Sequence, residues 1–127
     1  ERVSKQFSDL FERVQKFQCV HHKMSDCWLK MFELSHAICT MIKETQNTPS
    51  NIMLILASSI NDNIREFFAR YNIDRIISDC RSSPIHQDRY DENIEAFRLL
   101  FLDFSKLTEI LDRYYLKLER GFADIEI

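Results

Sequence analysis

Hydrophobic residues recur at alternating intervals of four and three positions over the first forty residues of the chain. This spacing places one apolar stripe on an α-helix that packs along its whole length against other helices. It predicts one continuous helix over residues 4–44, in which only His21 and Ser35 interrupt the apolar positions. The members of the stripe are Val3, Phe7, Leu10, Val14, Phe17, His21, Met24, Trp28, Met31, Ser35, Ile38 and Ile42.

The same spacing predicts two further helices after breaks in the pattern. Thr48 followed by Pro49 indicates a helix start, because proline is well tolerated at the first helical position. We therefore expect a second helix over residues 49–79, with a bend or a short separate helix near Asn72, where the apolar positions change face. After a polar stretch the pattern predicts a third helix over residues 92–123.

Few residues in this chain break helices. One glycine and two prolines are too few for a fold rich in strands and tight turns. Long helices joined by short connections predict an all-α fold, an elongated antiparallel three-helix bundle. We expect residues 1–127 to form a single helical-bundle domain that is a fragment of a larger protein.

The helix lengths predict a dimer or a contact with another chain. At 1.5 Å per residue the first helix is roughly 60 Å long, against roughly 46 Å and 48 Å for the other two. Its first turns would project and leave their stripe in water, which a homodimer partner or a helical heteropartner would cover. The run 52–57 is apolar on every side, so we expect it deep in the bundle or in a subunit contact. The candidate interface residues lie on the first stripe or beside the main seams: Val3, Phe7, Leu10, Phe11, Val14, Phe17, His21, Phe32 and Phe68.

Composition and charge narrow the function classes. The net charge is −3 and the basic residues are scattered, so we expect no nucleic-acid binding, and a membrane surface is not favoured as a partner. A single glycine rules out a phosphate-cradling loop or a dinucleotide fingerprint. No serine or cysteine stands in a recognisable nucleophile arrangement. We therefore expect no enzymatic activity, no cofactor and no small-molecule substrate.

The cysteines are expected to be reduced. Cys19 and Cys27 would lie roughly 12 Å apart on the first helix, too far for a disulfide, and at most one cysteine of that helix could pair with Cys80. Free thiols favour a cytoplasmic or nuclear protein. With His21 and His22 these cysteines lack the paired spacing of a zinc site, so we expect no metal. As a polar residue on the seam, His21 could instead specify register or partner.

These observations favour a non-enzymatic protein–protein interaction and oligomerisation module, a helical scaffold or adaptor. An alternative remains open. The predicted pattern of three long helices in a dimer resembles the crescent domains of the BAR type. This resemblance implies a scaffold that binds curved membranes. A secreted four-helix cytokine is disfavoured by the cysteine geometry and by the lack of a fourth predicted helix.

Overall fold

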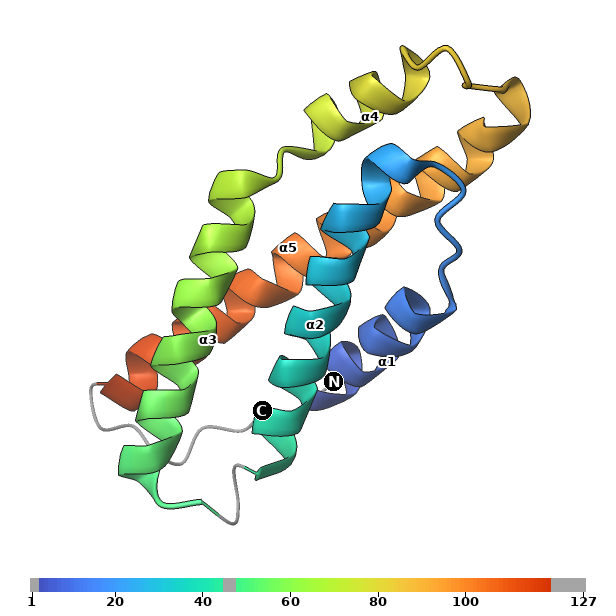
Figure 1. Ribbon diagram of the computed structural model, residues 1–127. Coiled ribbons are helices and arrows are strands. Elements are labelled where there is room, and N and C mark those ends of the chain that lie inside the picture. Colours follow the sequence, from blue (N-terminus) through green and yellow to red (C-terminus); the bar gives the residue numbers. More distant parts are fainter. Residues whose placement is uncertain (1–2, 45–47, 120–127) are drawn as a thin grey trace.

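The computed structural model describes residues 3–44 and 48–119 of the 127-residue chain. Five α-helices and one 3₁₀ turn make up this part, and it contains no β-strand, which confirms the predicted all-α class. The elements, shown in Figure 1, are α1 (Val3–Lys16), α2 (His22–Glu44), α3 (Ser50–Arg70), α4 (Ile73–Arg81), the 3₁₀ turn Asp88–Tyr90 and α5 (Asp91–Glu119).

The first predicted helix is two helices, so the expectation of one continuous helix over 4–44 is wrong. Residues 17–21 are not helical, and the chain reverses there so that α1 packs antiparallel on α2. Phe11 on α1 meets Phe32 on α2 with their ring centroids 5.5 Å apart. Since α1 lies beside α2 and α5, no part of a long first helix projects from the bundle.

The link at 17–21 is held at both ends by polar contacts. The His21 imidazole caps the start of α2, because its Nδ1 accepts the Lys23 backbone N–H at 3.1 Å. On the other side of the link, the Asn93 side chain of α5 donates from Nδ2 to the Gln18 carbonyl at 2.8 Å. The first bond satisfies a backbone N–H in the first turn of α2, and the second satisfies a carbonyl of the non-helical link.

The helices close into a ring around one core. α1 contacts α2 and α5, α2 contacts α3, and α3 contacts α5. Like α3, the short helix α4 lies between α2 and α5, so it extends the position of α3 in the ring (Figure 1). Neighbours in the ring run antiparallel (Figure 1). On one side of α5, Arg13 pairs with Asp103 and Phe17 packs on Phe97; on the other, Arg65 pairs with Asp112 and Phe67 packs on Phe104. The bundle therefore has four positions around its core rather than the predicted three.

The predicted second helix, over 49–79, bends where the sequence indicates. Tyr71 and Asn72 are extended, with φ/ψ of −112°/119° and −107°/118°, and they separate α3 from α4. The Asn72 side chain accepts the Arg75 backbone N–H at 3.0 Å and caps α4. The break near Asn72 is thus confirmed, whereas the end of the predicted third helix, at 120–123, lies outside the described residues.

Aromatic rings from α3 and α5 fill the centre of the core. Phe67 and Phe68 meet Phe101 and Phe104 with ring centroids 5.3–5.8 Å apart. Phe97, further along the same seam, packs against Phe17 of the link at 5.5 Å. Among the helices described, none is long and apolar enough to cross a membrane.

Candidate protein-binding surface

Four of the predicted interface residues on the first stripe are buried within the bundle. Phe7, Leu10, Val14 and His21 are at most 2% exposed, because α1 and the link pack against α2 and α5. The expectation that the first turns project and leave this stripe in water is therefore wrong. The other predicted interface residues are partly buried: Val3, Phe11, Phe17, Phe32 and Phe68.

A different set of aliphatic residues faces water, on the first turns of α3. Ile52 is 45% exposed, Ile55 is 67% exposed and Leu56 is 40% exposed. Their spacing of three and four residues puts them on one side of the helix, which we call the α3 apolar face. Residues 50–61 contain no charged side chain, so this face is also uncharged along its length.

This finding corrects one part of an expectation. The run 52–57 is expected either deep in the bundle or in a subunit contact. Only Met53 and Ala57, at 2% and 3% exposure, face the core, so the first alternative is wrong and the second stays a prediction. Among the helices of residues 3–44 and 48–119, none covers the other side of α3 at this end. The remaining exposed large hydrophobic residues of the described ranges come singly from other segments: Val20, Leu29, Ile85 and Leu99. Single exposed aliphatic side chains are ordinary on protein surfaces, whereas three on one helix side are a patch.

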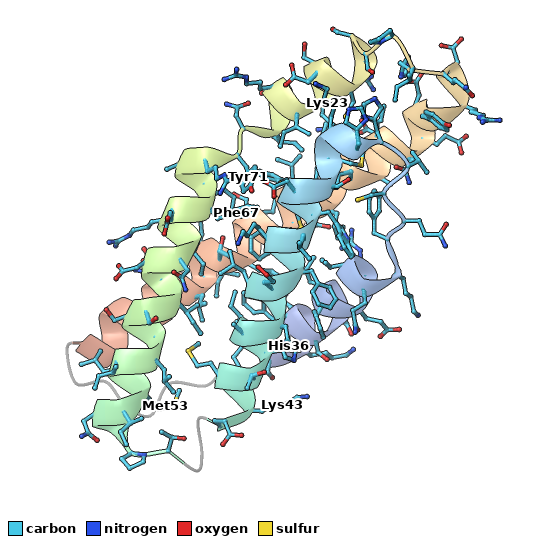
Figure 2. All side chains as sticks on the ribbon, viewed as in Figure 1. Lys23, His36, Lys43, Met53, Phe67 and Tyr71 are labelled. Atoms are coloured by element: carbon cyan, nitrogen blue, oxygen red, sulfur yellow. The ribbon has the colours of Figure 1, made fainter. Side chains whose placement is uncertain are left out.

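A groove lies between α2 and α3 beyond this face. It has a volume of about 330 Å³, and the buried side chains of Leu34 and Phe67 form part of its apolar lining. Figure 2 shows Phe67 and Tyr71 on the side of α3 that is turned toward α2. Charged groups of both signs line the groove as well, Lys30 and Glu33 from α2 and Glu66 and Arg70 from α3.

The α3 apolar face and the groove lie on the same side of α3. Leu56 is seven residues before Asn63 and fourteen before Arg70, and positions seven apart return to nearly the same side of a helix. The two regions therefore form one elongated surface, which we call the α2–α3 surface. From Ile52 to Arg70 it is about 27 Å long at 1.5 Å per residue.

The far end of this surface is fixed by a polar contact between the two helices. The Tyr71 hydroxyl donates a short hydrogen bond to Asp26 Oδ2 on α2, and Arg70 Nη2 donates to the same oxygen at 3.4 Å. Partial burial, together with this hydrogen bond to the carboxylate, raises the pKa of Tyr71 to about 12. Tyr71 therefore remains a neutral donor across the physiological range and holds this end of the groove in place.

Comparison with known proteins adds no functional information. No protein family, no curated protein and no solved structure matches this chain. At the sequence level, apolar residues on all sides of the run 52–57 indicate burial in the bundle or in a subunit contact, but they do not show which side of α3 is left uncovered. The lack of charge over residues 50–61 is the one sequence signal that marks this region.

Proposed function

We propose that this chain is a non-enzymatic protein-binding module that receives an amphipathic helix of a partner protein along the α2–α3 surface. The observation that carries the proposal is the uncharged α3 apolar face in line with a groove of mixed charge. Helix-in-groove recognition uses apolar anchors at one side of a helix together with polar contacts at the rim.

The energetics favour covering this face. Burying an aliphatic side chain completely is worth about 1.5–3 kcal/mol, so covering the exposed part of each of these three residues would contribute about 1 kcal/mol. The groove offers both signs of charge, which fixes the direction and register of a bound helix more than it adds affinity. The partner helix should therefore carry aliphatic residues at its α3-face end and one acid and one base at its groove end.

A partner helix fits this surface better than a second copy of the chain. Stable protein–protein interfaces bury about 800 Å² per partner, and the three aliphatic residues at one end of α3 fall well short of that area. A helix of about 18 residues would instead cover the face and the groove together. The membrane-scaffold alternative has less support, because it assumes three long helices and the first of these is two antiparallel ones.

The proposal is tested by titrating the purified chain with a designed amphipathic peptide of 20 residues. The peptide has leucines at helical spacing on its first turns and one Lys–Glu pair beyond them, and backbone amide NMR shifts report its position. We expect the shifts to fall on residues 52–70 and on the facing side of α2. The Ile55→Asp variant should lose binding, because it places a charge at the centre of the apolar face. Leu99→Asp, at a similarly exposed aliphatic position on α5, should retain it.

Three results would count against the proposal. The first is no binding at millimolar peptide, and the second is shifts confined to other helices. The third is a dimer of the unliganded chain in sedimentation that Ile55→Asp dissociates, because the occupant of the face would then be a second copy of the chain.

A further inference from the structure

We propose that His86, Asp88 and Asp91 form a binding site for a divalent transition-metal ion, with Zn²⁺ as the best-fitting ion. His86 lies in the connection after α4, Asp88 is the first residue of the 3₁₀ turn and Asp91 is the first residue of α5. One imidazole nitrogen and one oxygen of each carboxylate lie within 4.8 Å of one another.

The spacing of two of these atoms matches neighbouring metal ligands. His86 Nε2 lies 3.3 Å from Asp91 Oδ1, yet Asp91 Oδ1 has no hydrogen-bond partner. The imidazole nitrogen is thus close to the oxygen without being directed at it. Two ligand atoms that are each 2.0–2.1 Å from zinc at a tetrahedral angle lie about 3.3–3.4 Å apart. A rotation of the exposed Asp88 side chain would bring the third ligand into place.

An unsatisfied carboxylate oxygen within the cluster supports this assignment. Asp91 Oδ1 and His86 Nδ1 are both shielded from water, and neither has a hydrogen-bond partner. A shielded carboxylate oxygen without a hydrogen-bond donor is costly. Arg81 forms an ion pair with this oxygen, but its Nε is 3.9 Å away, beyond hydrogen-bond distance. A cation between Asp91 and His86 would compensate that oxygen. The His86 side chain is only 17% exposed, so packing already restricts its orientation.

The nitrogen and oxygen atoms of these three side chains indicate which kind of metal ion would bind. One imidazole with two carboxylates suits Zn²⁺ and related transition-metal ions, whereas Mg²⁺ and Ca²⁺ prefer sites made of oxygen alone. Three protein ligands leave at least one position for water or an external ligand. The site lies at the end of the bundle opposite the first turns of α3 (Figure 1), so its occupancy is independent of the proposed helix binding.

Zinc titration of the metal-stripped full chain tests this site, with calorimetry as the readout. We expect one equivalent of Zn²⁺ to bind, and Mg²⁺ at the same concentration not to displace it. His86→Ala and Asp88→Asn should each weaken binding at least about tenfold. The matched controls His36→Ala on α2 and Asp62→Asn on α3, both at exposed positions, should bind as the parent does.

Cobalt spectroscopy separates this site from binding by the free cysteines. A site of nitrogen and oxygen ligands gives Co²⁺ absorption without a thiolate-to-cobalt charge-transfer band. The proposal is overturned if no ion binds, if His86→Ala and Asp88→Asn leave zinc affinity unchanged, or if the charge-transfer band appears and disappears in Cys19→Ser. Circular dichroism of each variant confirms that loss of binding is not loss of fold.

Discussion

The indole Nε1 of Trp28 donates a 2.9 Å hydrogen bond to the backbone carbonyl of Val14, and this bond joins α2 to the last turn of α1. Carbonyls in the last turn of a helix have no partner within the helix, so Trp28 satisfies an acceptor that would otherwise remain unpaired. With 14 residues, α1 is too short to be stable alone in water. Its structure therefore depends on contacts such as this one with α2.

Replacement of Trp28 by Phe tests this contact. The ring is retained in large part, but the donor is lost, so the free energy of unfolding should fall by about 1–2 kcal/mol in urea denaturation. Leu29→Ala, at the neighbouring position where the side chain is 47% exposed, should change stability by less than about 0.5 kcal/mol. Equal effects of the two substitutions would show that the hydrogen bond contributes nothing.

The reversal between α1 and α2 could not be predicted from the hydrophobic pattern. Phe17 packs on Phe97, and His21 is 1% exposed, so both continue the four–three spacing through a segment that is not helical. The link contains neither glycine nor proline. The Gln18 carbonyl of the link accepts a hydrogen bond from the Asn93 side chain, 75 residues further along the chain. Such long-range contacts override local propensity.

The seam of α5, in contrast, was predictable. Ile94, Phe97, Phe101 and Phe104 are all at most 4% exposed, as their spacing indicates. Phe101→Ala should cost about 3–5 kcal/mol of unfolding free energy, because it empties space among the rings of Phe67 and Phe68. Leu99→Ala is the control on the same helix and should cost less than about 0.5 kcal/mol. A loss below about 1 kcal/mol at Phe101 would contradict the described packing.

The candidate sites could be predicted from the sequence less well than the core. Helical spacing separates Met53 and Ala57 from Ile52, Ile55 and Leu56, but which side remains uncovered depends on how many helices surround α3. Predicting four helix positions around the core requires the break at 17–21.

The proposed metal ligands come together through the local chain reversal before α5. There the His86 backbone N–H donates to the Ser83 carbonyl at 3.0 Å. From the sequence alone, Asp88 and Asp91 are interpreted as acidic residues that stabilise the start of a helix.

Stability should depend on pH through His21. Burial, followed by the nearby charges of His22, His86 and Lys23, lowers the pKa of its imidazole below the ordinary value. In the unfolded chain the group titrates near 6.5, so below that pH the unfolded state binds more protons and folding stability falls as the pH falls. Protonation would also remove the Nδ1 acceptor that caps α2.

The variant His21→Asn provides the comparison for this pH dependence. Asparagine caps helices through an oxygen that does not titrate. Thermal unfolding between pH 7.5 and 5.5, with a chelator present, should show a smaller decrease in Tm for the variant than for the parent. The slopes are compared rather than the absolute Tm, because the smaller side chain leaves space in the core. Parallel slopes would show that His21 does not carry the dependence.

Tyr71 should titrate above the usual tyrosine pKa. Its pKa is raised to about 12, so its hydrogen bond to Asp26 is present below pH 10, the usual tyrosine pKa, and is lost as the pH rises through 12. Absorbance titration of the parent should show a phase near pH 12 that Tyr71→Phe removes. At neutral pH the same variant should lower the unfolding free energy by about 0.5–1.5 kcal/mol. An unchanged titration curve would contradict this arrangement.

Two substitutions of Asn93 test its contact with the link, because they should lower the stability by different amounts. Asn93 Nδ2 donates to the Gln18 carbonyl, while Asn93 Oδ1 is buried without a partner. Asn93→Ala removes the useful donor and the unpaired acceptor together, so the loss should be only about 0.5–1 kcal/mol.

Asn93→Asp keeps the shape of the side chain but sets a carboxylate oxygen against the Gln18 carbonyl. That opposition should cost about 1–3 kcal/mol. A favourable interaction with the start of α5 offsets only about 0.3–1 kcal/mol of it, so the aspartate variant should be the less stable of the two. Limited proteolysis should also cleave it faster within residues 17–21. The opposite order of stability, with aspartate above alanine, would mean that α5 does not hold the link through this amide.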